Sequence, residues 1–261
     1  MLTYRIDGEG EPVLLLNGGM MTIGAWEPIA AALAPRFQVI RCDFRGQLLS
    51  PGEPEPRLEA HVRDLVELID GLGIDRVHLA GTSYGGLVGL LFAALHPERA
   101  ASLAVIAATG RITPEFWEST ARCRELALEA AAGGDGARVL EYILPETYTP
   151  EYLERQAPAL EFHRRWVAAL PVVWFRGLAA ILSSVEGVDL TPHLSAIRCP
   201  TLIVAGERDA MFPPEQSRAL AEAIPGARLR IVPGAPHGLV VENPDVTARL
   251  LLDFLPGASH A

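Results

Sequence analysis

The stretch Val77–Gly86, with the sequence VHLAGTSYGG, decides the fold of this chain. Its first four residues predict a short buried strand, and the apolar residues Leu87–Leu95 that follow predict a helix. Glycines two residues before and two residues after Ser83 permit a very tight turn between the predicted strand and the predicted helix. Such a turn exposes the serine hydroxyl at the carboxyl edge of a sheet, where a nucleophile is placed. The alternative is a plain glycine-rich turn in which Ser83 only caps the helix.

Short apolar runs alternate with helical stretches on both sides of this turn. Alternation of this kind predicts an α/β fold with a mostly parallel sheet and helices on both faces. The other expected strands are Val13–Leu16, Phe37–Cys42, Leu103–Ala107, Thr201–Ala205 and Leu229–Val232, and the other expected helices are Trp26–Leu33, Leu58–Leu72, Glu215–Ile224 and Pro244–Leu255.

Residues 111–190 break the alternation. Strand signals vanish there, and helical stretches rich in alanine, glutamate, arginine and aromatic residues take their place. We therefore expect a core built from residues 1–110 and 191–261, with a helical cap, or lid, at 111–190. The aromatic residues favour an apolar pocket, although packing on the core is the simpler role for any single one. Arg164 and Arg165 could bind a substrate carboxylate, but an exposed charged helix face is the stronger interpretation.

Composition excludes several classes of function. All 22 basic residues among the 261 are arginine, so chemistry that needs a lysine amine is absent. The net charge of −10, with no basic stripe, argues against nucleic acid and anionic membranes as partners. Cys42, Cys123 and Cys199 have no zinc-site spacing and suit a reducing compartment.

The N-terminal residues lack the pattern of a signal peptide, so a cytoplasmic protein is expected. We expect a small-molecule substrate and no metal or cofactor. The sequence leaves a homodimer open.

A serine nucleophile needs a base, and the base needs an orienting acid. His237 lies in a loop directly after a predicted strand and before the last helix, and Asp209 follows another strand. Both positions are at carboxyl ends of strands, where such folds build their sites. His163 and His193 are weaker candidates for the base, and Glu207 is the alternative acid.

Five motifs, taken together, resemble the α/β-hydrolase fold superfamily, in particular its serine esterases and lactonases, over nearly the whole chain. The resemblance implies an α/β-hydrolase fold with the cap inserted before the acid-bearing strand. It also implies an oxyanion hole formed by the amides of Tyr84 and Gly19, with Met20 as the second candidate on that loop. The motifs are Asn17-Gly18-Gly19, Asp43-Phe44-Arg45-Gly46, Gly81-Thr82-Ser83-Tyr84-Gly85-Gly86, Gly206-Glu207-Arg208-Asp209 and Pro236-His237-Gly238.

Two residues depart from the family pattern. Asn17 stands where the family usually has histidine, as in members resembling 3-oxoadipate enol-lactonases, and this favours lactones and small esters. Leu48 replaces a glycine beside the site, so a changed loop path and pocket shape are expected there.

The expected activity is cleavage of small carboxylic esters or lactones through an acyl-enzyme on Ser83. Two alternatives stay open at this point. The same triad could serve an acyltransferase or a hydrolase of carbon–carbon bonds, or the scaffold could bind a ligand with little turnover.

Overall fold

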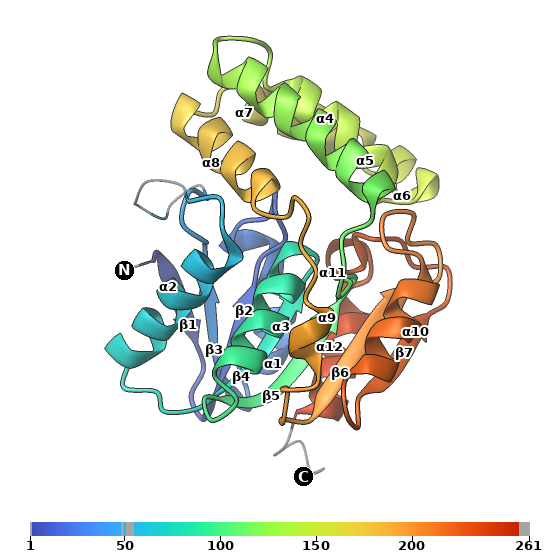
Figure 1. Ribbon diagram of the computed structural model, residues 1–261. Coiled ribbons are helices and arrows are strands. Elements are labelled where there is room, and N and C mark those ends of the chain that lie inside the picture. Colours follow the sequence, from blue (N-terminus) through green and yellow to red (C-terminus); the bar gives the residue numbers. More distant parts are fainter. Residues whose placement is uncertain (1, 48–49, 51–54, 256–261) are drawn as a thin grey trace.

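The computed structural model describes residues 2–47, 50 and 55–255. Within these residues the chain forms a seven-stranded sheet with the order β1-β3-β2-β4-β5-β6-β7 (Figure 1). Neighbouring strands are parallel, except that β1 is antiparallel to β3. This confirms the mostly parallel sheet that the alternating sequence pattern predicts. The strands are β1 (Tyr4–Asp7), β2 (Glu11–Leu16), β3 (Phe37–Cys42), β4 (Val77–Thr82), β5 (Ala100–Ile106), β6 (Thr201–Gly206) and β7 (Arg228–Val232).

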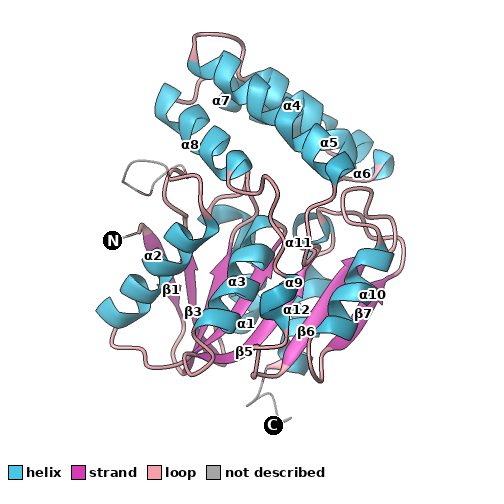
Figure 2. Cartoon of the chain, in the orientation of Figure 1, coloured by secondary structure: helices cyan, strands magenta, loops and turns pink. Residues whose placement is uncertain are grey.

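Helices cover both faces of the sheet (Figure 2). Apolar side chains such as Leu65 and Leu87 fix α2 and α3 to one face, and Ile29 and Leu251 fix α1 and α12 to the other. Both core clusters consist of buried apolar side chains, whose removal from water stabilises the layered arrangement. The core helices are α1 (Glu27–Leu33), α2 (Leu58–Gly71), α3 (Tyr84–Leu95), α9 (Thr191–Leu194), α10 (Pro214–Ala223), α11 (Leu239–Glu242) and α12 (Pro244–Phe254), with the 3-10 helix η1 (Ile23–Trp26) before α1.

Between β5 and α9 the described chain forms five helices that make a separate layer, the cap, above the sheet (Figure 1). The cap has its own apolar cluster, which includes Cys123, Val139 and Trp174. The predicted domain boundaries at 110/111 and 190/191 stay a prediction. The cap helices are α4 (Pro114–Ala131), α5 (Ala137–Thr147), α6 (Pro150–Arg155), α7 (Ala157–Ala168) and α8 (Val172–Ser183).

The cap contacts the core on either side of the sheet's central strands. The Gly238 amide donates to the Thr147 carbonyl oxygen over 2.7 Å. Nearby, the Thr149 hydroxyl donates to the Glu242 carboxylate over 2.6 Å. On the other side, α8 packs against the loop after β3 so closely that a Cβ atom at Gly177 would lie 1.8 Å from the Gly46 carbonyl oxygen.

The sequence analysis missed β1, which pairs with β3 from Tyr4–Cys42 to Asp7–Val39. This strand has only four residues, and none of its side chains is fully buried. It therefore lacks the apolar run by which the other strands were located. The other six predicted strands are confirmed, with ends that move by no more than three residues.

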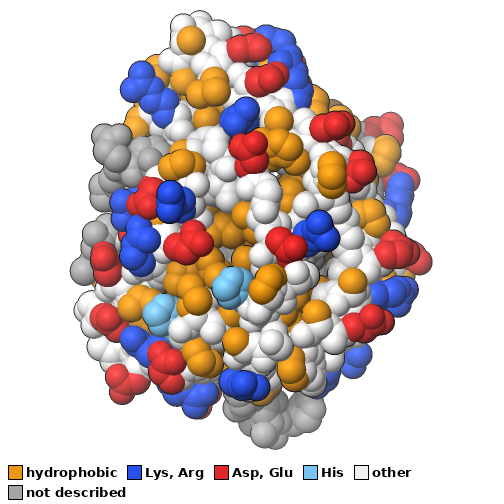
Figure 3. Space-filling model, viewed as in Figure 1, with side chains coloured by type: hydrophobic (Ala, Val, Ile, Leu, Met, Phe, Trp, Pro, Cys, Tyr) orange, Lys and Arg blue, Asp and Glu red, His pale blue; other side chains and the backbone are white. Residues whose placement is uncertain are grey.

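Among the described helices, no single one is long and apolar enough to cross a membrane. Among the described helices, α7 and α8 reach the length and apolar composition of a membrane span only when they are taken together. These two helices are bent by 101° relative to each other. On the face viewed in Figure 3, acidic and basic side chains are interspersed, and neither sign forms a broad continuous area.

Candidate active site

Ser83 lies in the turn between β4 and α3 at φ +51° and ψ −116°. A non-glycine residue at positive φ is strained, so the surroundings must hold it in place. A Cβ atom at Gly81 would lie 2.2 Å from the Gly85 carbonyl oxygen, and one at Gly85 would lie 2.3 Å from that of Leu16. Both glycines are therefore needed for this tight turn. The Ser83 amide donates to the Ile106 carbonyl oxygen over 2.8 Å and ties the turn to β5.

The structure brings Ser83, His237 and Asp209 together in one chain of hydrogen bonds. His237 Nε2 lies 3.0 Å from Ser83 Oγ, and His237 Nδ1 lies 3.0 Å from Asp209 Oδ2 and 3.2 Å from Oδ1. An ionised carboxylate only accepts hydrogen bonds, which assigns the proton of the neutral ring to Nδ1. Nε2 is then the acceptor for the serine hydroxyl proton, as a general base requires.

The Asp209 carboxylate is held by the backbone as well as by His237. Its Oδ1 accepts hydrogen bonds from the amides of Met211 and Phe212, over 2.9 and 2.8 Å. The aspartate is 4% exposed and the histidine 7%. Burial of the pair strengthens the electrostatic contact between the carboxylate and any positive charge on the ring.

The competing candidates from the sequence are not part of this chain of hydrogen bonds, although His163 lines the same cavity as Ser83. The Glu207 carboxylate accepts a hydrogen bond from the Gly234 amide, on an exposed loop. His163 lies on α7 in ring contact with Phe162, and the exposed His193 lies on α9. None of these three side chains forms a hydrogen bond with Ser83, His237 or Asp209 in the described part of the chain.

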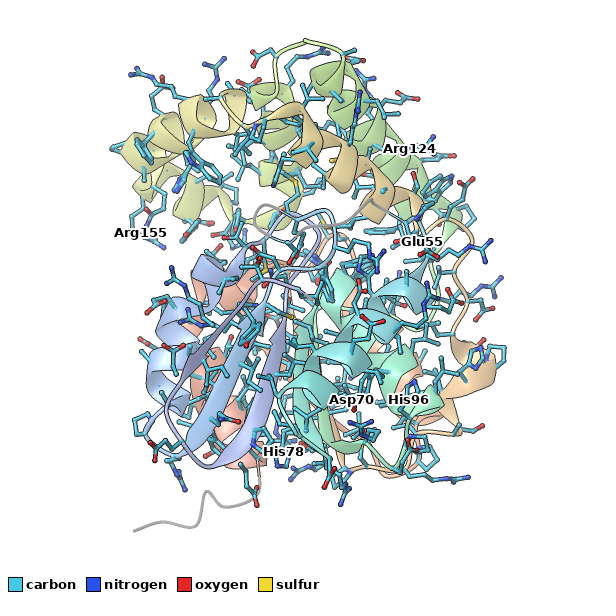
Figure 4. All side chains as sticks on the ribbon, turned by 90° about the vertical axis from the view of Figure 1, so that its left-hand side faces the viewer. Glu55, Asp70, His78, His96, Arg124 and Arg155 are labelled. Atoms are coloured by element: carbon cyan, nitrogen blue, oxygen red, sulfur yellow. The ribbon has the colours of Figure 1, made fainter. Side chains whose placement is uncertain are left out.

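His96 ends α3 at the edge of the core remote from the cap (Figure 4). His260 lies outside the described residues.

The two predicted oxyanion residues, Gly19 and Tyr84, line the same cavity as Ser83. Tyr84 is the first residue of α3, so its amide has no acceptor within that helix. On the loop after β2, the Gly18 amide donates to Met21 Sδ over 3.3 Å. The amides of Gly19 and Met20, both of which line the cavity, are therefore the candidates on that loop. Their role in catalysis stays a prediction.

Asn17 is part of a buried polar network beneath this loop. Its Nδ2 donates to Asp43 Oδ1 over 2.9 Å and to Gln47 Oε1 over 3.1 Å. Asp43 Oδ1 also accepts from the Ile23 amide over 2.9 Å. Gln47 Oε1 accepts from the Phe44 amide over 2.8 Å, which fixes its own amide group so that Nε2 donates to the carbonyl oxygens of Gly18 and Gly19.

Gln47 was not singled out from the sequence. It directly follows the motif Asp43-Phe44-Arg45-Gly46, and only the three-dimensional structure shows that it reaches the loop after β2. Leu48, the expected departure beside it, lies outside the described residues.

A cavity of about 660 Å³ lies between the cap and the core and includes Ser83 and His237 in its lining. Most of its lining is apolar and comes from both layers, as with Leu87, Phe116 and Trp174. Its composition fits an uncharged organic substrate held by a few polar groups. Cys123 also lines it, but burial raises the pKa of this thiol to about 12, which keeps it a weak nucleophile.

Arg164 and Arg165 do not line the cavity. Arg164 pairs with Glu141 and Arg165 with Glu161, in both cases between exposed side chains. The exposed helix face is therefore the correct interpretation of these two arginines. Among the described residues, no three His, Cys, Asp or Glu side chains are grouped so that they could hold a metal ion.

Comparison with known proteins agrees with this arrangement. Residues 11–244 match the family model of the alpha/beta hydrolase fold. A relative from Azorhizobium caulinodans, provisionally named carbamate hydrolase RutD, is 33% identical over 97% of this chain and 94% of its own.

Solved structures give the same result. The enol-lactonase of Burkholderia xenovorans is 32% identical and superposes with a TM-score of 0.85, over 97% of this chain and 95% of its own. An esterase from Thermogutta terrifontis is 29% identical with a TM-score of 0.86, over 99% and 94% of the two chains. The chain belongs to the α/β-hydrolase family and is a hydrolase.

Proposed function

We propose that the protein is a serine hydrolase that cleaves small carboxylic esters or lactones through an acyl-enzyme on Ser83. The observation that carries the proposal is the 3.0 Å contact between Ser83 Oγ and His237 Nε2 at the wall of the cavity. A hydroxyl in hydrogen-bond contact with an oriented imidazole is the arrangement that activates serine. The relatives named as an enol-lactonase and an esterase support the choice of ester and lactone substrates.

In the first half of the reaction, His237 takes the hydroxyl proton as Ser83 Oγ attacks the acyl carbonyl carbon. Asp209 holds the ring and stabilises its positive charge. The amides of Tyr84 and Gly19 donate to the oxyanion that forms. The carbon–oxygen bond then breaks, and His237 returns the proton to the leaving alcohol. In a lactone this alcohol stays attached to the acyl chain.

In the second half, His237 takes a proton from water, which attacks the acyl-enzyme carbonyl carbon. The tetrahedral intermediate collapses, releases the carboxylic acid and returns the proton to Ser83. Every step uses groups of this chain, the substrate and water.

The first test compares wild type with Ser83→Ala on p-nitrophenyl esters of short and medium chain length, several lactones and an aryl carbamate. The carbamate is included because of the name that the Azorhizobium caulinodans relative carries. Turnover in wild type that is lost in Ser83→Ala supports the proposal. A fluorophosphonate probe checks the nucleophile independently, and labelling is expected at Ser83 only.

The outcomes separate the alternative functions. Product analysis with and without an alcohol acceptor distinguishes hydrolysis from acyl transfer, because only a transferase forms the new ester efficiently. Saturable ligand binding with no turnover and no labelling at Ser83 would overturn the proposal in favour of a binding module.

A further inference from the structure

The cavity that contains Ser83 has few charged groups in its lining. Its lining includes one carboxylate, Glu146, and no arginine among the described residues, and the chain has no lysine. The remaining lining is apolar or carries uncharged polar groups, besides His163 and His237.

The arginines of the cap point elsewhere. Arg124 lies over the Trp117 ring, and Arg155 lies over the Tyr152 ring. Figure 4 shows these two arginines on opposite sides of the cap. Neither lines the cavity, so no described guanidinium is placed to bind an anionic substituent there.

Glu146 comes from a part of the cap that contacts the loop carrying His237. It is the penultimate residue of α5, and the carbonyl oxygen of the next residue, Thr147, accepts the hydrogen bond from the Gly238 amide. Gly238 directly follows His237 in the chain. The carboxylate is therefore carried by a segment fixed to the site by a backbone hydrogen bond.

One oxygen of this carboxylate has a partner in the protein. Glu146 Oε2 accepts a hydrogen bond from the Ser119 hydroxyl over 2.9 Å. The other oxygen, Oε1, accepts no hydrogen bond from the described residues. This oxygen is accessible to solvent. Oε1 thus has no protein partner among the described residues, and Glu146 lines the cavity.

A carboxylate in an apolar cavity acts strongly on other charges. Glu146 is half-buried, and the effective dielectric constant at such a position is lower than in bulk water, so its repulsion of a second anion and its attraction of a cation are both stronger than in solution. Leaving Oε1 without a donor when a substrate displaces water also costs free energy. Both effects favour a substrate that brings no negative charge.

We propose that Glu146 sets the charge preference of the enzyme: it admits uncharged and ammonium-bearing esters and rejects esters that carry a second, free carboxylate. The proposal rests on the serine-hydrolase function above and adds the class of substrate.

The test uses three p-nitrophenyl esters of equal acyl length that end in a methyl, a carboxylate or an ammonium group. In wild type, kcat/KM for the carboxylate ester is expected to be at least about 10-fold below that for the methyl ester. Glu146→Gln is expected to raise the carboxylate-to-methyl ratio about 5-fold or more and to lower the ammonium-to-methyl ratio. Each ratio is taken within one variant, so a partly unfolded preparation does not change it.

Glu141→Gln is the matched control. Glu141 lies on the same helix, pairs with Arg164 on the surface and does not line the cavity. Its replacement changes the net charge by the same amount, and both ratios are expected to stay at their wild-type values. A change of equal size in the control would assign the effect to overall charge and overturn the proposal.

The outcomes also separate this inference from the function beneath it. Absence of methyl-ester turnover together with absence of Ser83 labelling means that the serine-hydrolase function fails. Turnover that depends on Ser83, with ratios that do not respond to Glu146→Gln, means that the function stands and the inference is wrong.

Discussion

The side-chain Nε2 of Gln47 lies 2.9 Å from the carbonyl oxygen of Gly18 and 3.3 Å from that of Gly19. In a trans peptide unit the carbonyl and the N–H point in opposite directions. Holding the Gly18 and Gly19 carbonyls towards Gln47 therefore turns the amides of Gly19 and Met20 away from it. The glutamine thus fixes the orientation of the peptide units that carry the expected oxyanion donors.

Gln47→Glu tests this relationship. It puts a carboxylate of the same shape beside two carbonyl oxygens and removes the donor. We expect kcat for a p-nitrophenyl ester to fall about 10- to 100-fold with a smaller change in KM, because oxyanion contacts act mainly in the transition state.

Steady-state kinetics measure the effect of Gln47→Glu. Gln38→Glu on β3 is the control, since it makes the same change near the amino end of the sheet and should leave kcat unaltered. An unchanged kcat in Gln47→Glu would show that the glutamine does not orient the loop for catalysis.

The backbone at Ser83 predicts a difference between two inactive variants. Ser83→Ala and Ser83→Gly both remove the hydroxyl, so both should lose at least about 10³-fold in turnover. Only glycine tolerates φ +51° without strain. Ser83→Gly should therefore be more stable than Ser83→Ala by about 1 kcal/mol of unfolding free energy. Urea unfolding measures this, and equal stabilities would argue against strain at the turn.

The close contact between α8 and the loop after β3 makes Gly177 sensitive to substitution. Helix propensity alone predicts that Gly177→Ala stabilises the protein by about 1 kcal/mol. The added Cβ atom would instead lie 1.8 Å from the Gly46 carbonyl oxygen, so we expect a net loss of about 1–3 kcal/mol. In the control Gly24→Ala, the nearest atom is a hydroxyl oxygen at 3.7 Å, an ordinary contact. A Gly177→Ala protein as stable as wild type would show that α8 can move away from the loop after β3 without a loss of unfolding free energy.

His61 predicts a pH dependence of stability. Burial lowers the pKa of its imidazole from about 6.5 to about 4, and the ring packs edge-on against Phe44 and Tyr84. Between pH 6.5 and about pH 4, His61 binds a proton in the unfolded chain but not in the folded protein. The unfolding free energy therefore decreases as the pH falls through this range. His61→Phe should reduce the drop in unfolding free energy from pH 7.5 to 4.5 by about 2 kcal/mol. Parallel stability curves for the two proteins would contradict this.

The candidate triad could be located from sequence because each member follows a strand with a readable apolar run. Ser83, Asp209 and His237 come just after β4, β6 and β7, and parallel strands bring their carboxyl ends to one edge. Local pattern and general topology were sufficient for that part of the site. Strand β1 was missed for the converse reason, since a short and partly exposed strand carries little apolar signal.

Gln47 and Glu146 show what local pattern does not contain. The glutamine acts across 29 positions of the chain on Gly18, and the glutamate enters the cavity only because the end of α5 contacts the loop after β7. Such contacts depend on how layers pack against each other. Their side chains are ordinary polar residues in the sequence, with no spacing that marks them.

Ser83 and His237 are separated by 154 positions, and their contact forms only when β6 and β7 have joined the sheet beside β5. Contacts between such distant segments form slowly during folding, because long loops must close first. Catalytic activity should therefore return later in refolding than helical circular dichroism does. Turnover of an ester would then report completion of the native topology, while spectroscopic signals report its earlier, local stages.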